Sequence, residues 1–546
     1  MLLIQQAQGL FFEKYHSIFI INADHNKKAL FSRSKVFTDM ICSGRMEIVM
    51  FYKSTRNSDI KVTSAEAITQ GISAEGGLFV PEEIPAISID EIKGLADMSY
   101  ADRAAFVFSK YLTDFTDAEI HYCTDNAYTT KNFESESITE ISHLFDGTYM
   151  LELWHGPTCA FKDMALQILP YFLTTSAKKI NLDKKIVILV ATSGDTGKAA
   201  LEGFKDVEGT QIMVFYPEQG VSPMQKRQMI TQEGSNVGVC AIKGNFDDCQ
   251  NGVKSIFTDN DIKAKLENGS MMFSSANSIN WGRLVPQIVY YVSSYAELVK
   301  NEQISAGEKI NIVVPTGNFG NILAAYYAKQ MGVPVNKLIC ASNINNVLTD
   351  FINTGIYDRN RNFYATCSPS MDILISSNLE RLLYILTGCN DAKIKEWFGS
   401  LAETGKYEVS DDIKKLLKQD FCAGFCDDND TKATIKKIFD EYSYTCDTHT
   451  AVAVKVYNDY IAETGDKTKT IIASTASPYK FSASVLEAID GSAPEIDEYD
   501  MIEKLYEHSG YAVPKSLAEL KNKKARFDVS IEKSEMKDFV LKNLGL

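Results

Sequence analysis

Apolar runs alternate with amphipathic segments through the middle of the chain, and this alternation is its clearest pattern. Six runs predict strands buried on both faces: Lys185–Ala191, Gln211–Tyr216, Gly238–Ile242, Asn311–Val314, Leu338–Ala341 and Thr470–Ala473. Continuous apolar strands between helices are typical of parallel sheet that is covered on both faces. We therefore expect an α/β protein whose ligands bind at the carboxyl ends of the strands.

Helical patterns flank the alternating region on both sides. Upstream, a helix over Val62–Gly71 opens at Thr63 or Ser64 and carries Glu66 in its first turn. Residues 82–150 predict helices with polar connections. Within that range, the expected helices are Ile89–Leu95, Tyr100–Tyr111 and Asp117–Ala127. Further along the chain, most of 372–465 and a charged tail from 495 to 546 are also expected to be helical.

These patterns divide the chain into five expected parts. They are an extension of uncertain structure over 1–45, a mostly helical N-terminal domain over 46–135, a large domain over 136–190 and 306–495, a smaller α/β domain over 191–305, and a C-terminal helical tail over 496–546.

The first 45 residues differ from the rest in charge. They hold six basic residues against three acidic ones, Glu13, Asp24 and Asp39, and they lack the order of charge, apolar core and small residues of a signal peptide. We expect the functional chain to start near Met46, and deletion of residues 1–45 to leave folding and activity intact.

Composition narrows the classes of partner. A net charge of −15 argues against nucleic acid or an anionic membrane surface, and no apolar run is long enough to span a membrane. The eleven cysteines are scattered, and Cys422 and Cys426 lack the second half of a zinc site. The histidines show no metal-ligand spacing, so we expect no metal and a cytoplasmic protein with reduced thiols.

Lys162 is the residue most suggestive of chemistry. It stands between Phe161 and Asp163, after a run of turn-forming residues and before an apolar helical pattern. A surface lysine in the first turn of a helix is the ordinary interpretation. However, apolar surroundings lower the pKa of a lysine and make its amine nucleophilic toward a carbonyl.

Two glycine loops, each between a strand and a helix, predict anion sites. The first is Thr192–Gly197, and the second is Gly317–Asn321. Small residues let backbone N–H groups point into a cavity, and a helix N-terminus favours negative charge. The first loop is not a Walker loop, because Thr192 and Ala199 occupy positions that require glycine and Ser/Thr. A tight turn without a ligand is the alternative for the first loop.

A third loop follows the last predicted strand and reads Ser474-Thr475-Ala476-Ser477-Pro478. A hydroxyl there could hydrogen-bond a ring nitrogen without adding charge, although the segment also suits an ordinary Ser/Thr turn. Two anion loops and a desolvated lysine together suggest a phosphorylated aldehyde cofactor with an anionic substrate.

Five motifs together resemble threonine synthase, a family of fold-type-II enzymes that depend on pyridoxal 5′-phosphate. They are HGPTCAFKD (155–163), ATSGDTG (191–197), PTGNFGN (315–321), SPSMDILISSNLERLLY (368–384) and EAITQGISAEGGLFVPEEIP (66–85). The last two are much more specific to threonine synthase than the others. The resemblance covers roughly Phe51 to the C-terminus and implies two parallel-sheet domains covered by helices, with the larger domain binding the cofactor.

The resemblance also implies a role for each matching residue. Lys162 would hold the cofactor covalently and later move protons, and Thr475 would meet the pyridine nitrogen. The residues expected at the cofactor phosphate are Gly317, Asn318, Phe319, Gly320 and Asn321. The residues expected at the substrate are Ser193, Gly194, Asp195 and Thr196 for the α-carboxylate, and Arg283 for the phosphate, where a structural salt bridge is the alternative.

Two departures from the family pattern affect fine specificity. The chain reads STASPYKF where the family usually has STAHPAKF, so Ser477 and Tyr479 replace histidine and alanine. It also reads STRNSD over 54–59, where the family usually has a glycine after the arginine.

The resemblance implies conversion of O-phospho-L-homoserine and water to L-threonine and phosphate, by a monomer or homodimer. The alternatives are another lyase of the same group, such as a threonine dehydratase or a phospho-lyase acting on an amino-alcohol phosphate, and a catalytically silent cofactor-binding homologue.

Overall fold

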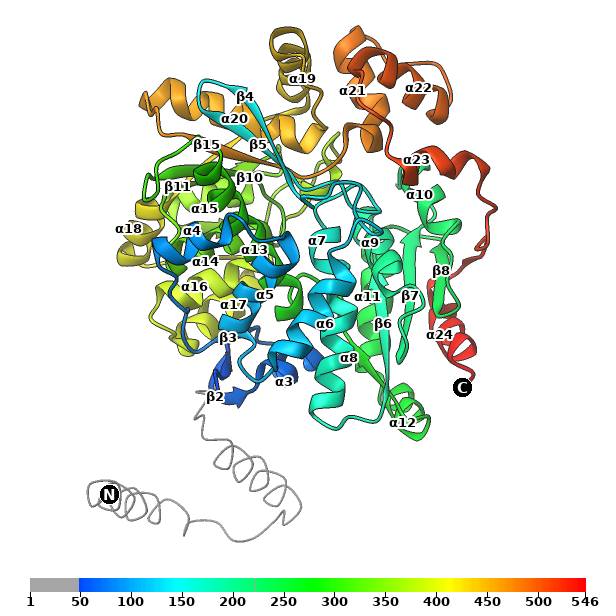
Figure 1. Ribbon diagram of the computed structural model, residues 1–546. Helices are drawn as coiled ribbons and strands as arrows, with labels where there is room; N and C mark the ends of the chain where they lie inside the picture. The colour runs from blue at the N-terminus through cyan, green and yellow to red at the C-terminus, as the bar shows by residue number, and fades with distance from the viewer. Residues whose placement is uncertain (1–48, 220) are drawn as a thin grey trace, which may run out of the picture. The chain divides into compact units, whose positions relative to one another are not determined.

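The computed structural model describes residues 49–219 and 221–546 (Figure 1). The predicted extension over 1–45 and the expected start near Met46 lie outside the described residues. No helix in the described ranges is long and apolar enough to cross a membrane.

The larger of two main sheets has six strands in the order β14-β11-β10-β15-β5-β4. Their bounds are Glu140–Phe145 (β4), Thr148–Glu152 (β5), Ile310–Pro315 (β10), Val335–Ser342 (β11), Phe421–Phe425 (β14) and Thr470–Ser474 (β15). All neighbours are parallel except β4 and β5. The carboxyl ends of β5, β10, β11 and β15 therefore meet at one edge of the sheet.

The second sheet has five parallel strands in the order β16-β8-β7-β6-β9. Their bounds are Lys185–Ala191 (β6), Thr210–Pro217 (β7), Val237–Ile242 (β8), Met271–Ser274 (β9) and Ser530–Ile531 (β16). The predicted domain boundary between residues 190 and 191 falls inside β6, which pairs only with strands of this sheet. The sheet therefore begins at Lys185, while the rest of the domain division stays a prediction.

Smaller strand pairs and helices complete the fold. The remaining strands are Tyr52–Ser54 (β1), Asn57–Val62 (β2), Phe79–Pro81 (β3), Ile356–Asp358 (β12) and Lys406–Glu408 (β13). The helices up to residue 331 are Ser64–Gln70 (α3), Ile89–Leu95 (α4), Tyr100–Tyr111 (α5), Asp117–Ala127 (α6), Asp163–Leu166 (α7), Leu169–Lys179 (α8), Asp195–Phe204 (α9), Pro223–Ile230 (α10), Phe246–Thr258 (α11), Asn260–Asn268 (α12), Trp281–Lys300 (α13) and Gly320–Met331 (α14). The later helices are Val347–Thr354 (α15), Leu379–Leu386 (α16), Asp391–Thr404 (α17), Asp411–Asp420 (α18), Asp428–Tyr442 (α19), Thr448–Thr464 (α20), Ser482–Asp490 (α21), Glu498–Ser509 (α22), Lys515–Ala518 (α23) and Met536–Leu544 (α24), with short 3₁₀ turns at Pro369–Met371 and Pro478–Phe481 among others.

The helices cover both sheets on both faces, as the apolar strands require. Helix α20 packs on β10, β11 and β15 of the larger sheet, and α14 packs on β10 and β11. Helices α9 and α11 both pack on β7 of the second sheet, and α7 packs against α9 between the two sheets (Figure 1). The α/β prediction with parallel sheets is confirmed.

The N-terminal region combines helices with a small antiparallel sheet, β2-β1-β3. Helix α3 begins with a capping box in which Thr63 accepts from the backbone of Glu66, so of the two predicted starting residues, Thr63 and Ser64, Thr63 is the cap. The region shares its core with α8 and α13, since Phe108 meets Phe172 edge-on at 5.0 Å and Tyr111 meets Trp281 at 5.5 Å. It is therefore packed onto the sheet domains.

Two predictions of helix were wrong in part. Residues 82–150 contain the hairpin of β4 and β5, and residues 372–465 contain β13 and β14. Strand β4 lies at the edge of its sheet and most of its residues are not buried, so it lacks the buried apolar run by which the other strands are recognised.

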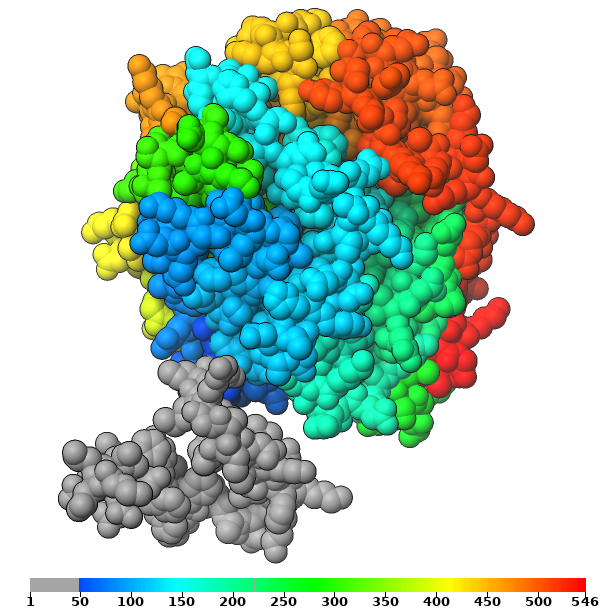
Figure 2. All heavy atoms as spheres, viewed as in Figure 1, coloured from blue at the N-terminus to red at the C-terminus, as the bar shows by residue number. Residues whose placement is uncertain are grey.

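The segment that we name the closing segment, residues 509–531, follows helix α22 and leads to the second sheet, and atoms of this orange-to-red part of the chain lie at the surface (Figure 2). At its start, the Tyr479 hydroxyl donates to the Tyr511 carbonyl at 2.5 Å. In its middle, the Lys515 N–H donates to Glu134 and the Arg227 guanidinium donates to the Leu520 carbonyl. At its end, β16 joins the second sheet beside β8. The predicted helical tail thus also contributes a strand.

Candidate active site

Lys162 lies at the end of a loop that is hydrogen-bonded to the loop after β15. The Phe161 N–H donates to the Thr475 carbonyl at 2.8 Å, and the Ser477 N–H donates to the Cys159 carbonyl at 3.1 Å. Within the lysine loop, the buried Asp163 carboxylate accepts from the backbone and hydroxyl of Thr158, at 2.8 and 2.7 Å. These bonds place Lys162 and Thr475, which are far apart in the sequence, at one site.

The Lys162 amine is largely buried and contacts two polar groups. Its Nζ donates to Ser370 Oγ at 3.1 Å and lies 3.5 Å from Asp195 Oδ2. Burial lowers the pKa of Lys162 below its ordinary value, with Asp195 opposing and Lys480 and Arg283 assisting the shift. The predicted desolvated lysine is therefore present, and it is the group most able to act as a nucleophile.

Asp195 is a buried carboxylate with two cationic neighbours. Besides Lys162, it contacts Lys480 Nζ at 2.6 Å and accepts from Gln225 Nε2 at 2.9 Å. Burial raises its pKa, but the two ammonium groups outweigh burial and hold the pKa well below its usual range. Its side chain is thus already engaged, and only its backbone is available to an anionic substrate.

The first glycine loop presents free donors. Thr192 Oγ1 accepts from the N–H groups of Gly194 and Gly197 and so closes the turn. A Cβ at Gly194 would overlap the side chain of Gln225 at 2.4 Å, so a larger residue does not fit there. Across residues 49–219 and 221–546, the N–H groups of Ser193, Asp195 and Thr196 meet no acceptor. This is the arrangement that a carboxylate ligand needs.

The second glycine loop offers a larger set of donors. Six consecutive backbone N–H groups, those of residues 317–322, have no acceptor within the described part of the chain. They lie at the start of α14, where Phe319 adopts a left-handed conformation with φ of 61°. Asn321 is fixed here because its Oδ1 accepts from the hydroxyls of Tyr290 and Tyr291. Such a row of N–H groups fits a phosphate.

Thr475 and its neighbours form the opposite side of the site. The Thr475 side chain is nearly buried, and its hydroxyl makes no hydrogen bond within the described ranges. Its N–H donates to Thr450 Oγ1 at 3.4 Å. The hydroxyl is therefore available to a ligand atom, and its predicted contact with a pyridine nitrogen stays a prediction.

Arg283 is buried without a counterion among the described residues. Its Nη1 donates to the Ala276 carbonyl, while its Nε has no partner. Burial lowers the pKa of Arg283 to about 10. The alternative of a structural salt bridge is excluded for the described residues, and the guanidinium remains able to bind an anion.

Sequence reasoning missed three residues of this site: Ser370, His449 and Lys480. Ser370 Oγ donates to Asp195 at 3.2 Å, and its N–H donates to His449 Nε2 at 3.1 Å. Lys480 is fully buried and also donates to the Thr158 carbonyl at 2.8 Å. Ser370 lies in the motif SPSMDILISSNLERLLY, and Lys480 lies in the segment STASPYKF. For Lys480, the available signal in the sequence was a lysine close to the loop that follows a buried strand.

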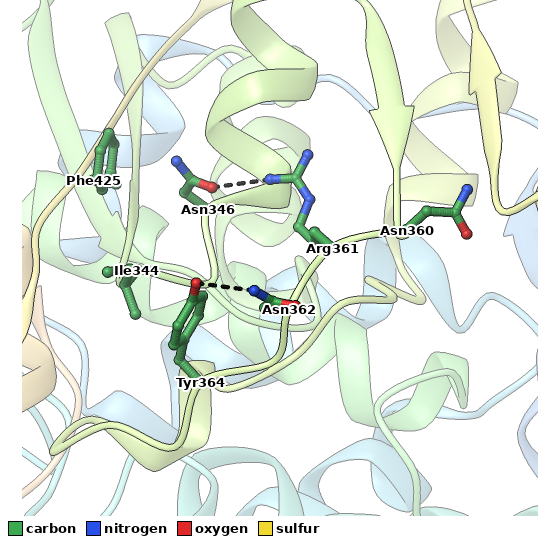
Figure 3. A pocket seen from close by; sticks show the side chains of 7 residues that line it. All are labelled: Ile344, Asn346, Asn360, Arg361, Asn362, Tyr364 and Phe425. Atoms are coloured by element: carbon green, nitrogen blue, oxygen red, sulfur yellow. Dashed lines mark hydrogen bonds between the residues drawn. The ribbon is translucent and has the colours of Figure 1, made fainter.

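Two other features lie apart from the Lys162 contacts. An open pocket of about 550 Å³ is lined by Ile344, Asn346, Asn360, Arg361, Asn362, Tyr364 and Phe425 (Figure 3). Glu140, Glu152 and His155 bring their ligating atoms within 4.8 Å of one another. In that cluster His155 Nε2 already shares a hydrogen bond with Glu152 at 2.9 Å, so the histidine is satisfied without a metal.

Three family models match the chain. They are threonine synthase N terminus at residues 51–128, pyridoxal-phosphate dependent enzyme at 140–410, and threonine synthase C-terminal at 450–540. Threonine synthase of Saccharomyces cerevisiae is 37% identical over 83% of this chain and 91% of its own length. Threonine synthase-like 1 of Homo sapiens is 42% identical over 78% of this chain, which spans only 58% of that relative.

Solved structures agree with these relatives. A pyridoxal-phosphate-bound threonine synthase from Brucella melitensis superposes with a TM-score of 0.81 at 32% identity, over 91% of this chain and all of that one. Yeast threonine synthase gives a TM-score of 0.81 at 34% identity, over 91% and 99%.

The fold and the site define a pyridoxal-phosphate-dependent enzyme of fold type II. The lysine, the phosphate-sized row of N–H groups and the free threonine hydroxyl all fit that cofactor. Within this class, the matches at both ends of the chain show that it belongs to the threonine synthase family.

Proposed function

We propose that the protein converts O-phospho-L-homoserine and water to L-threonine and phosphate. The observation that carries this proposal is Arg283, a buried guanidinium with no carboxylate partner in the described ranges, whose charge adds to the lowering of the Lys162 pKa that burial mainly causes. A second phosphate, distinct from that of the cofactor, gives this charge a ligand.

Each group has a role in this reaction. The cofactor, when bound, supplies an electron sink for the carbanions that form as the α- and β-protons leave. Its phosphate would be held by the N–H groups of Gly317, Asn318, Phe319, Gly320 and Asn321, and its ring nitrogen by Thr475. Lys162 carries the protons, and the burial of the site keeps bulk water from them.

The substrate would be held at both ends. The N–H groups of Ser193, Asp195 and Thr196, with Gly194 allowing their close approach, suit the α-carboxylate. Arg283 suits the phosphate that leaves from the γ-carbon. A proton then adds at the γ-carbon, which becomes the methyl group, water adds at the β-carbon, and a proton returns to the α-carbon.

We place the protein in the cytoplasm. The ten cysteines in the described residues are all free thiols. Unpaired buried cysteines support a reducing compartment.

A phosphate-release assay on O-phospho-L-homoserine tests the proposal, with threonine measured in the same reaction. Equal amounts of phosphate and threonine are expected. Phosphate without threonine, or phosphate only from an amino-alcohol phosphate, would favour the phospho-lyase alternative, and 2-oxobutanoate from threonine would favour the dehydratase.

One observation favours a related lyase as the second candidate. Ser477, where the family has histidine, is fully buried and its hydroxyl has no partner among the described residues. The imidazole that the family usually has at this position is thus missing. A cofactor-loaded protein that bleaches on borohydride but turns over none of these compounds would instead support a catalytically silent homologue.

A further inference from the structure

Asp195 and two lysines form a buried array beside the cofactor site. Lys480 Nζ lies 2.6 Å from Asp195 Oδ1, and Lys162 Nζ lies 3.5 Å from Asp195 Oδ2. The Lys480 side chain is 0% exposed and that of Asp195 is 3% exposed. One carboxylate therefore serves two ammonium groups, and Lys480 is the closer partner.

Lys480 is held where it is from both sides. It sits in the 3₁₀ turn Pro478–Phe481, whose first flanking residue, Ser477, is bonded to the Cys159 carbonyl. Its ammonium also donates to the Thr158 carbonyl at 2.8 Å. Lys162, in contrast, has one hydrogen bond, to Ser370. The geometry thus fixes Lys480 on Asp195 and leaves Lys162 more loosely held.

We propose that Lys480 is a positioning residue for Lys162: it is the permanent counterion of Asp195, which allows Lys162 to lose its proton and bind the cofactor aldehyde. A buried carboxylate needs a cation, and a lysine in that role stays charged. An ammonium has no lone pair with which to attack a carbonyl carbon. With Lys480 in the role, the Lys162 nitrogen bonds to the aldehyde carbon, the carbonyl oxygen leaves as water, and the ammonium proton goes to solvent.

The proposal depends on the cofactor of the family but not on the phosphohomoserine substrate. The charged groups facing Lys162 are Asp195, Lys480 and Arg283. Those facing Lys480 are Asp195, Lys162, Asp163 and the Cys159 thiol. Among them only Asp195 contacts both lysines, so it is the group through which Lys480 acts on Lys162.

The test measures Lys162 directly in the full chain after the cofactor is removed. An amine-reactive reagent is applied across a pH series, and mass spectrometry gives the labelled fraction of Lys162. In the wild type, the midpoint of the labelling curve, which is the pH at which half of Lys162 is deprotonated, should lie below the ordinary lysine value of 10.5. In Lys480→Met, Asp195 keeps Lys162 as its only lysine partner, so the midpoint should rise by about one pH unit, with labelling below it roughly tenfold slower.

Two variants separate charge from structure. Lys480→Arg keeps the positive charge and should stay within about half a pH unit of the wild type. Lys198→Met is the matched control, because Lys198 is also buried but pairs with Glu202 at 2.8 Å and Gln232 at 2.5 Å. It should leave the Lys162 midpoint unchanged.

Either of two results overturns the proposal. One is a folded Lys480→Met protein whose Lys162 titrates as in the wild type, which is what a purely structural role predicts. The other is a folded Lys480→Arg protein with a midpoint raised by a full unit. If Lys480→Met does not fold, Lys480→Gln, which keeps a donor for the Thr158 carbonyl, takes its place with the same expectation. Failure of turnover on phosphohomoserine would not affect any of these readings.

Discussion

Substitution of Gly317 by alanine tests how the second glycine loop and the lysine site depend on each other. A Cβ at Gly317 would lie 2.8 Å from the Ser370 carbonyl oxygen and 3.5 Å from Met371 Cα. Both atoms belong to the backbone, which cannot swing aside as a side chain does. The alanine keeps its N–H group, so the number of donors for the cofactor phosphate does not change.

The size of the effect follows from this contact. Ordinary contact begins at 3.4 Å, so the turn at Ser370 has to withdraw by about 0.6 Å. Ser370 Oγ hydrogen-bonds Lys162 at 3.1 Å and Asp195 at 3.2 Å, and a shift of that size along either bond would lengthen it beyond hydrogen-bonding range. Overpacking of this kind costs about 1–3 kcal/mol of unfolding free energy, and misplacement by part of an ångström lowers turnover by about 10- to 100-fold.

Thermal and denaturant unfolding, cofactor affinity and turnover should be measured on the same samples. Gly399→Ala is the matched control, because Gly399 is an exposed position within α17 and a Cβ there meets nothing within 4 Å. It should raise stability by about 0.5–1 kcal/mol, through helix propensity alone. A Gly317→Ala protein with wild-type unfolding and wild-type turnover would refute the steric argument.

Three other predictions, which use four substitutions, have clear outcomes. Lys162→Ala should reduce turnover below about a hundredth of the wild-type rate in a steady-state assay. A higher remaining activity would mean that transition-state stabilisation falls by less than ~3 kcal/mol, which is too little for removal of the covalent anchor. Thr475→Val should retain the cofactor but slow the reaction. Gly320→Val, whose Cβ would lie 3.3 Å from Asn378 Nδ2, should weaken cofactor retention in equilibrium dialysis. The reverse pattern would mean that the two loops are wrongly assigned. Burial raises the pKa of Asp163 from 3.8 to about 6, so Asp163 holds its proton more tightly in the folded protein than in the unfolded chain. Relative to Asp163→Asn, the wild type should therefore lose unfolding free energy as pH rises from about 4 to about 6. Parallel curves of stability against pH for the two proteins would contradict this.

The sequence predicted the elements whose signals are local. Strands such as Lys185–Ala191 are apolar throughout, and α3 has its capping box within four residues, so each is visible in a short window. The β4–β5 hairpin was missed because β4 is an exposed edge with a mixed pattern. Short strands such as β9 and β14 carry too few residues to show a period.

The site divides in the same way. Lys162, Thr475 and the two glycine loops have local signatures, and the structure brings them together. The contacts of Ser370 and Lys480 are long-range, since Ser370 is 175 residues from Asp195 and Lys480 is 322 residues from Thr158. No window of sequence contains such pairs, so the buried charge array becomes visible only after the chain has folded.

The closing segment has a consequence for how the protein is made. Strand β8 ends at Ile242, but its outer partner, β16, begins only at Ser530. At the usual pace of synthesis, β8 waits about 15 to 60 seconds for that partner to emerge from the ribosome. During this time, an apolar strand presents an unpaired edge, which is a template for pairing with other nascent chains. Strand β16 covers the end of this edge by pairing with Ala241 and Ile242, so we expect a chain that stops before Ser530 to leave the edge open and to fold in lower yield.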